Sequence, residues 1–179
     1  MRRLTRPVLA VAGRRGLIGS SESFIARAAR VGDSSALLGQ FRSAGRFDRC
    51  LEESMVCTAV GDGSVECTLE VTESLANNYG TLHGGAISTI VDVVGTLALL
   101  SVDPSRAGVS VEMSTSFCSA AKIGESLTLT GRTLRYGKSL GFTEIEVRKA
   151  ASAEGAPPTL VATGRHTKMF PPPAAKSKM

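Results

Sequence analysis

The sequence predicts an α+β domain in which an antiparallel sheet wraps around one long helix. Residues 83–101 form the longest apolar segment, and their aliphatic side chains recur at the three- and four-residue spacing of a helix. A glycine-centred hairpin precedes this segment, and a run of alternating strands follows it. One apolar helix followed by a meander of strands favours a sheet packed around that helix.

The chain before the long helix is predicted to form short elements. Residues 34–49 carry apolar side chains at near-helical spacing and begin with two serines that could cap a helix. Residues 54–60 and 64–71 are predicted strands, joined by a Gly-Asp-Gly turn. Residues 72–82 are polar and contain glycine, which indicates a loop that leads into the helix.

Strands make up most of the chain after the helix. Residues 109–118 and 126–130 alternate regularly between apolar and polar side chains. Residues 140–149 alternate less regularly, and residues 159–168 form the last predicted strand. The edges and the outer face of such a sheet need cover, and dimerisation provides it in a domain of this size.

Length and charge divide the chain into three parts. It has 179 residues, which suits one domain with an extension, and a net charge of +5. Residues 1–32 hold seven arginines and one acid, whereas the remainder holds 14 basic and 15 acidic residues. The basic character therefore belongs to the leader, which argues against a nucleic-acid-binding domain. We expect a leader at 1–33, a domain at 34–170 and a disordered tail at 171–179.

The leader is rich in arginine and contains no lysine. This composition is typical of a mitochondrial transit peptide and predicts a protein of the mitochondrial matrix. The alternative is a disordered basic tail that stays attached. A secretory signal fits less well, because no apolar stretch of about 7–15 residues precedes a small-residue cleavage site.

Two further features limit the class of protein. No apolar run reaches the ~18 residues that span a bilayer, because polar residues interrupt the longest run. The four cysteines form no CxxC pair and the chain has two histidines, so a zinc site of ordinary spacing is not expected. We predict free thiols in a reducing compartment.

His83-Gly84-Gly85 marks the start of the predicted long helix. The first N–H groups of a helix lack intrahelical partners and carry partial positive charge. Two glycines leave these groups accessible, so a polarised carbonyl or an oxyanion could bind there. The alternative is a plain junction between loop and helix, in which glycine supplies backbone freedom.

Asp92 lies in the middle of the same helix. Its neighbours three and four residues away are all small or polar, namely Ser88, Thr89, Gly95 and Thr96. A ligand can approach a carboxylate on such a stripe closely, and the carboxylate could then act as a general base. The alternative, equally favoured by the spacing, is the solvated face of an amphipathic helix.

Three polar positions outside the helix could join a site. Asn77 is by default a turn residue, although its amide could donate to a bound carbonyl. Ser110 lies on the polar face of a strand, and a nucleophilic serine is not expected because neither a GxSxG elbow nor a Ser-His-Asp order surrounds it. His166 lies on the last strand with Arg165 and Lys168, where they could face an anionic ligand or form an edge-strand charge cluster that discourages aggregation.

Taken together, these motifs resemble a known family. The stretch NNYGTLHGGAISTIVD, from Asn77 to Asp92, resembles the signature of the hotdog-fold acyl-CoA thioesterases of the phenylacetate-pathway type. The resemblance covers most of residues 36–170. It continues through GVSVEM (108–113), AKIGE (121–125), GKSLGF (137–142) and ATGRHTK (162–168).

The resemblance implies five or six antiparallel strands around a central helix, with paired subunits and often a homotetramer. The active site would lie between subunits. Asn77 and the Gly84 N–H would hold the thioester carbonyl oxygen, and His83 would orient that loop. The partner subunit's Asp92 would activate water or attack directly, with Ser110 helping to position the water. The nine residues from His83 to Asp92 span about 13 Å of helix, which agrees with a shared site.

The resemblance implies no metal and no redox cofactor, because CoA enters as part of the substrate. A thiolate is a good leaving group, so a carboxylate base, a water molecule and an oxyanion hole suffice. CoA is strongly anionic, so basic residues should gather where it binds. The candidates for contact with the CoA moiety are Gly85, Arg135, Lys138, Arg165, His166 and Lys168.

We therefore expect an acyl-CoA thioesterase that hydrolyses fatty acyl-CoA to free fatty acid and CoA. One alternative is a non-catalytic hotdog subunit that binds acyl-CoA or is an accessory part of a mitochondrial assembly. The presence of all the catalytic-type residues argues against it. Another is a hydratase or dehydratase of the same fold, which the HGG block disfavours. The expected partners are the acyl-CoA substrate and further copies of this chain, with no nucleic acid and no membrane span.

Overall fold

A computed structural model describes residues 47–51, 53–150 and 157–171. The predicted leader, most of the expected helix within 34–49 and nearly all of the tail lie outside the described residues. Of that expected helix only the end is described, as the short 3-10 helix η1, Phe47–Leu51.

The two strands that follow form the predicted hairpin. Strand β1, Met55–Gly61, pairs antiparallel with β2, Ser64–Glu70. The turn between them has left-handed backbone, with φ of 51° at Asp62 and 79° at Gly63. Asp and Gly both tolerate this region, which is why the Gly-Asp-Gly sequence closes the hairpin. A second 3-10 helix, η2, covers Glu73–Leu75 in the following loop.

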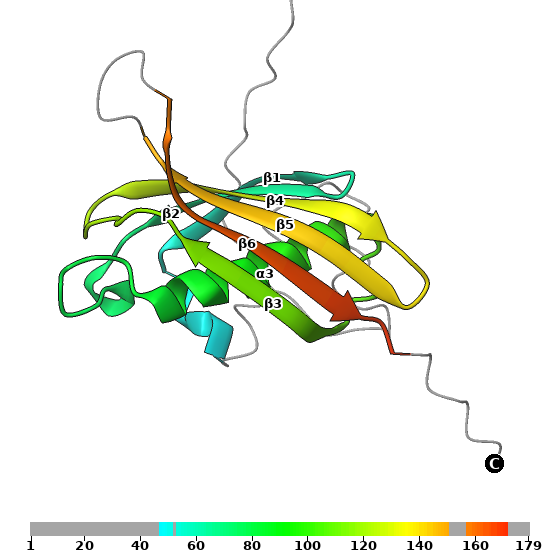
Figure 1. The fold of residues 1–179 in the computed structure, drawn as a ribbon. Helices are drawn as coiled ribbons and strands as arrows, with labels where there is room; N and C mark the ends of the chain where they lie inside the picture. Colours follow the sequence, from blue (N-terminus) through cyan, green and yellow to red (C-terminus); the bar gives the residue numbers. More distant parts are fainter. Residues whose placement is uncertain (1–46, 52, 151–156, 172–179) are drawn as a thin grey trace, which may run out of the picture.

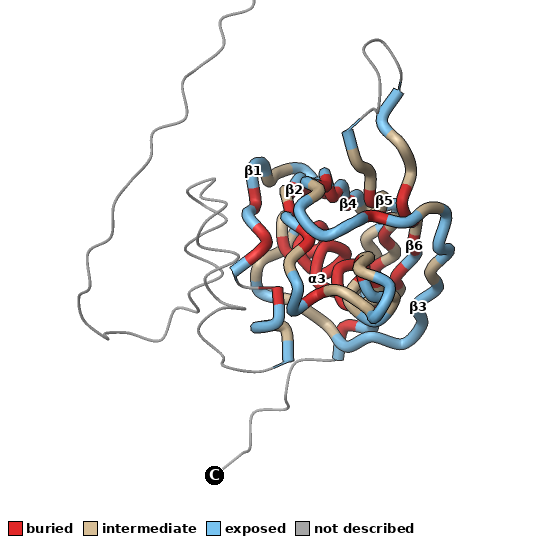
Figure 2. The backbone as a smooth tube through the Cα atoms, turned by 90° about the vertical axis from the view of Figure 1, so that its left-hand side faces the viewer, coloured by how far each residue is buried: buried red, intermediate tan, exposed pale blue. Residues whose placement is uncertain are grey.

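The long helix α3, Gly84–Val102, forms where the apolar periodicity predicts it. The sheet curves over this helix (Figure 1), and α3 forms the buried centre of the molecule (Figure 2). By length and hydropathy alone α3 could cross a membrane, but 67% of the qualifying stretch is buried inside the domain. We therefore assign α3 as the core helix.

Six strands form one antiparallel sheet in the order β1-β2-β4-β5-β6-β3. The four strands after the helix are β3, Val109–Phe117; β4, Ser126–Tyr136; β5, Leu140–Lys149; and β6, Thr159–Met169. The sheet and its single central helix confirm the predicted fold class. All four cysteines of the chain are free thiols, as predicted.

Glycines in the sheet allow α3 to lie close to it. A Cβ atom at Gly131 of β4 would lie 2.7 Å from Val94 Cγ1 and 3.0 Å from the Val94 carbonyl oxygen. A Cβ atom at Gly164 of β6 would lie 2.6 Å from Val91 Cγ2. Side-chain atoms do not approach each other so closely, so the short distance between α3 and the sheet depends on these two glycines. This close packing sets the turn of α3 that carries Asp92 against β6.

Strand β3 lies at the edge of the sheet and contains a bulge. Its register with β6 shifts between Ser110 and Glu112, so Ser110 pairs with Lys168 and Met113 pairs with His166. Directly paired residues share a face, so Ser110 and Met113 point to the same side despite their odd separation. The regular alternation predicted for residues 109–118 is therefore wrong at Ser110, because the bulge adds one residue to β3.

Candidate active site

The first half of the candidate site is the N-terminus of α3. The His83 side chain caps the helix, because its Nδ1 accepts a hydrogen bond from the Gly85 N–H at 2.8 Å. Among the described residues, no group accepts from the Gly84 N–H. Beside it lies a cleft of about 320 Å³, lined by Leu82, Gly84, Ile87, Phe117, Cys118, Ser119 and Ala120. An unpartnered N–H at a helix N-terminus can polarise a carbonyl bound in such a cleft.

Asn77 organises the loop that leads into this helix. Its Oδ1 accepts hydrogen bonds from the backbone N–H of Tyr79 at 2.9 Å and of Thr81 at 3.3 Å. Its Nδ2 donates to Thr81 Oγ1 at 3.0 Å. These contacts are the turn role that asparagine commonly plays. The side-chain amide has two hydrogens, so one remains for a ligand.

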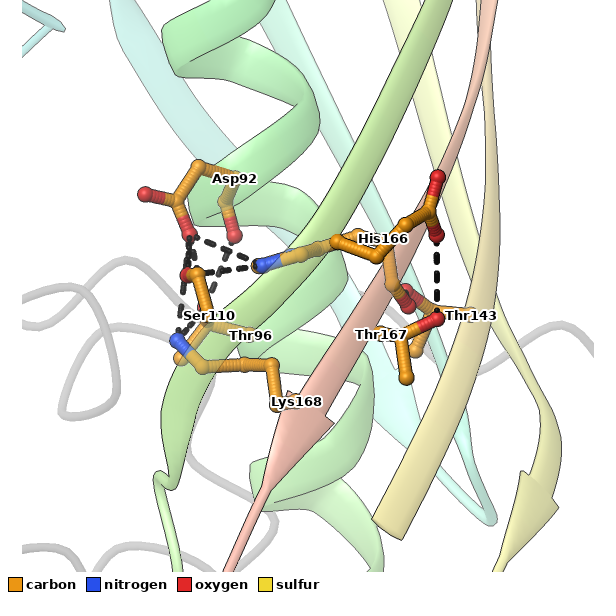
Figure 3. A network of polar contacts seen from close by, with 8 residues as sticks. Asp92, Thr96, Ser110, Thr143, His166, Thr167 and Lys168 are labelled. Carbon is orange, nitrogen blue, oxygen red and sulfur yellow. Dashed lines mark hydrogen bonds and ion pairs between the residues drawn. The ribbon is translucent and has the colours of Figure 1, made fainter.

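The second half of the candidate site surrounds Asp92, about two turns into α3. Its side chain is 42% exposed. The Oδ1 atom lies 3.3 Å from Ser110 Oγ and 3.4 Å from His166 Nε2. Figure 3 shows these side chains converging on Asp92 from β3 and β6. The proximity of Ser110 to Asp92 that the resemblance implied is therefore confirmed.

Thr96 and Lys168 complete this cluster. Lys168 Nζ donates to Thr96 Oγ1 at 2.8 Å and lies 3.7 Å from Asp92 Oδ1. The Thr96 hydroxyl in turn donates to the Asp92 backbone carbonyl at 2.7 Å. Burial lowers the pKa of Lys168, and the attraction of Asp92 acts in the opposite direction.

His166 is fully buried, and burial lowers its pKa more than the nearby Asp92 raises it. The neutral imidazole carries one N–H. Among the described residues its Nδ1 has no hydrogen-bond partner, whereas Nε2 lies 2.8 Å from Ser110 Oγ and faces the Asp92 carboxylate. An ionised carboxylate only accepts hydrogen bonds, so the hydrogen belongs on Nε2.

This arrangement differs from a Ser-His-Asp triad. In a triad the imidazole joins serine and aspartate through its two different nitrogens. Here the same nitrogen of His166 faces both Ser110 and Asp92. Ser110 accepts from His166 and can donate to Asp92, which suits a serine that positions a neighbour. The geometry therefore agrees with the expectation that Ser110 is not a nucleophile.

Two of the residues suggested for the CoA moiety lie elsewhere than expected. His166 is 0% exposed and Lys168 is 7% exposed, and both face Asp92 inside the domain. In this chain the two residues are therefore not on an exposed surface that CoA could reach, because the inner face of β6 is covered by α3.

The other suggested CoA contacts are accessible. Gly85, Arg135 and Lys138 are exposed. Arg165 is exposed on the outer face of β6, where its guanidinium lies 3.9 Å from Glu144. Consecutive side chains of a strand point to opposite faces of the sheet, so the sequence already contains the information that Arg165 and His166 face opposite sides.

The sequence identified Thr96 only as a small or polar neighbour of Asp92, and it did not predict that Lys168 lies beside Asp92. A signal for Thr96 was present, since it follows Asp92 by four residues and therefore lies on the same side of α3. The contact with Lys168 brings together residues 72 positions apart in the chain. It depends on how α3 crosses β6, which the sequence pattern does not specify.

The two halves of the site are well separated within one chain. Asp92 follows Gly84 by eight residues, or about 12 Å along the helix at 1.5 Å per residue. A single thioester carbonyl cannot contact both groups of one chain directly.

Comparison with known proteins identifies the family. Residues 79–156 match the family model described as the thioesterase superfamily. The chain is 39% identical over 122 residues to acyl-coenzyme A thioesterase 13 of Homo sapiens, a match that covers 68% of this chain and 83% of that protein.

Solved structures agree with this result. Thioesterase superfamily member 2 of zebra fish gives a TM-score of 0.69 at 34% identity, over 77% of this chain and 98% of the other. A protein of Streptococcus mutans bound to acetyl CoA gives a TM-score of 0.58 at 26% identity, over 65% and 86%. The matched family model spans both Gly84 and Asp92, and the protein belongs to the thioesterase superfamily.

Proposed function

We propose that this protein is an acyl-CoA thioesterase that hydrolyses fatty acyl-CoA to free fatty acid and CoA. The observation that carries the proposal is Asp92, a half-exposed carboxylate supported by Ser110 and His166 in a chain of the thioesterase superfamily. The relatives support CoA as the carrier. One is named acyl-coenzyme A thioesterase 13, and another binds acetyl CoA.

Hydrolysis needs a base for water and a donor for the carbonyl oxygen. Asp92 takes a proton from water while the water oxygen attacks the thioester carbon. The negative charge moves to the carbonyl oxygen, which the Gly84 N–H and the Asn77 amide stabilise. The C–S bond then breaks, and the proton on Asp92 returns to the CoA thiolate. The products are a fatty acid and CoA.

The separation of Gly84 and Asp92 favours a site shared between two subunits. Strand β3 is the edge that a second copy would use, because it exposes main-chain groups and the apolar residues Val109, Val111 and Phe117. Pairing two β3 strands about a twofold axis would continue the sheet and bring Gly84 of one protomer toward the partner subunit's Asp92. Two such dimers would form the homotetramer.

The CoA moiety of a bound substrate is expected to extend out of this shared site and to contact exposed basic residues. Among the candidates for contact with CoA, Arg135, Lys138 and Arg165 have exposed basic side chains that can reach its phosphates, and Gly85 lies at the N-terminal end of α3. Replacing Lys138 by Met should raise KM for acyl-CoA several-fold while leaving kcat nearly unchanged, because the contact is the same in the ground and transition states. An unchanged KM would remove Lys138 from this role.

The test of the function is thiol release from short, medium, long and aromatic acyl-CoAs by the full chain. Asp92→Asn keeps the shape of the side chain but removes its basicity, so kcat should fall by roughly 10²–10⁴. The matched control is Asp62→Asn in the exposed hairpin turn, where asparagine also tolerates the left-handed backbone. Turnover by the parent that survives in Asp92→Asn would contradict the assignment of the base.

A non-catalytic subunit that binds acyl-CoA is the alternative. It predicts binding of acyl-CoA by the folded protein without thiol release across the whole panel. A retained Asp92 cluster argues against it, because a binding protein has no use for a partly desolvated carboxylate near an anionic ligand.

We further propose that the protein acts in the mitochondrial matrix and that its arginine-rich leader is the transit peptide. The full chain should be imported by isolated mitochondria only when their inner membrane is energised, and a shorter product should then appear. A chain with the seven leader arginines replaced by glutamine is the control. Equal import of both chains would contradict the proposal.

A further inference from the structure

Lys168 is a buried ammonium group for which the mechanism above has no role. The residue is 7% exposed and lies on the inner face of β6, under α3. A charged amine in such a place requires close partners, since burial favours its neutral form. Its partners are Thr96 Oγ1 at 2.8 Å and Asp92 Oδ1 at 3.7 Å.

The contacts of Thr96 fix the direction of these hydrogen bonds. The single Thr96 hydroxyl hydrogen is donated to the Asp92 backbone carbonyl at 2.7 Å. Thr96 Oγ1 therefore accepts from Lys168 and cannot donate to the Asp92 carboxylate at the same time. A second hydrogen of the ammonium group can then point toward Asp92.

The side-chain contacts of Asp92 all reach the same carboxylate oxygen. Ser110, His166, Thr96 and Lys168 lie 3.3, 3.4, 3.5 and 3.7 Å from Oδ1. Among the described residues, no side chain forms a hydrogen bond with Oδ2. Because the Asp92 side chain is 42% exposed, Oδ2 is the oxygen that remains accessible to a water molecule.

We propose that Lys168 is a positioning residue for the hydrolysis, whose ammonium group anchors Asp92 Oδ1 so that Oδ2 faces the reacting water. This inference rests on the proposed function. Lys168 differs from the other contacts of Oδ1 in carrying a full positive charge, since the buried His166 is neutral and Ser110 is a hydroxyl. At 3.7 Å it is an ion pair and not a hydrogen bond, and it attracts the negatively charged carboxylate with a full opposite charge.

The kinetic test compares Lys168→Met with Lys122→Met in the full chain. Methionine retains most of the volume of lysine but removes the charge, and Lys122 is an exposed lysine outside the cluster. We expect kcat for acyl-CoA to fall about 10- to 100-fold in Lys168→Met with KM changed less than about twofold, because the reacting water loses its alignment. Lys122→Met should match the parent.

Stability separates positioning from a structural role. Asp92 is half-exposed, so water can solvate it when Lys168 is removed, and loss of a buried charge should leave Tm unchanged or raise it. A purely structural lysine would lower Tm and leave kcat intact. If Lys168→Met does not fold, Thr96→Val decides instead. It keeps the shape but removes the acceptor for the ammonium, and should lower kcat by a smaller factor.

The dependence of kcat on pH provides a further test, because a purely structural role of Lys168 would not affect it. The charged groups around Lys168 are Asp92 from α3 and Asp48 from η1, with the neutral His166 beside it on β6. Burial lowers the pKa of Lys168, so the parent should lose kcat at alkaline pH as the ammonium loses its proton. This alkaline limb should be absent in Lys168→Met and present in Lys122→Met.

The outcomes separate the two proposals. A parent without thiol release on any acyl-CoA would overturn the proposed function and this inference with it. A parent that turns over, with Lys168→Met within about twofold of it or with the alkaline limb retained, would overturn this inference alone. Loss of kcat together with loss of the alkaline limb is the result that supports it.

Discussion

His166 shows how burial decides the chemistry of a single side chain. Its ring lies 3.4 Å from a carboxylate, which favours the protonated form, yet removal from water favours the neutral form more strongly. A neutral ring with its hydrogen on Nε2 can orient Ser110 without competing for the proton that Asp92 removes from water.

The lowered pKa of His166 predicts a pH-dependent stability. In the unfolded chain this histidine binds a proton near its ordinary pKa of 6.5, whereas the folded protein resists protonation. The unfolded state therefore binds more protons as pH falls below that value, and the free energy of unfolding decreases. Tm should fall as pH is lowered from 7.5 to about 5.5.

Substitution of each histidine in turn tests whether the His166 ring causes this pH dependence of Tm. His166→Gln should flatten the dependence of Tm on pH in that range. The chain has two histidines, so His83→Asn, which keeps an acceptor at the helix cap, is the control and should retain the dependence. An equally steep dependence in His166→Gln would show that other groups cause it.

At the scale of elements, α3 packs closely against the sheet because glycines, which have no side chain, face it. Gly131→Ala would place a methyl group 2.7 Å from Val94 Cγ1 and 3.0 Å from the backbone oxygen of the helix. The Val94 side chain can rotate away from the new methyl group, but the Val94 backbone oxygen cannot easily move. We therefore expect a loss of about 1–3 kcal/mol in the free energy of unfolding. Chemical denaturation measures it.

A neighbouring position supplies the control for this substitution. Thr130→Ala changes an exposed residue of the same strand and should alter stability by less than about 0.5 kcal/mol. If the two variants unfold alike, the helix has room to shift away from β4.

Periodicity was sufficient to predict most of these elements. The 3.6-residue pattern located α3, the two-residue pattern located the strands, and the Gly-Asp-Gly turn located the hairpin. Asp92 and Ser110 were identified as site residues by motif. The bulge in β3 was not predictable, because it is a property of pairing with β6, and it is the bulge that turns Ser110 toward Asp92.

At the scale of the whole molecule, the two edges of the sheet allow a matched comparison. Strand β1 exposes Val56 at 54%, and β3 exposes Val111 at 52%. If β3 is the edge that pairs with a second copy, Val111→Lys should place a charge in that contact and shift the protein toward the monomer, with loss of activity.

The prediction that β3 forms the interface is checked by measuring the mass of the assembly that the full chain forms in solution. Val56→Lys carries the same change on the opposite edge and should retain the assembly and the activity of the parent. Dissociation by Val56→Lys alone would place the interface on β1 and contradict the shared site built on β3.

The position of Gly84 and Asp92 on one helix, about 12 Å apart, has a genetic consequence. If each site takes its donors from one chain and its carboxylate from the other, two defective chains can complement each other. Asn77→Asp keeps the acceptor that holds the loop but removes one of the two donors to the carbonyl oxygen, whereas Asp92→Asn removes the base. Each variant alone should be inactive, but random co-assembly should recover about a quarter of parental turnover, since half the pairs are mixed and each contains one intact site.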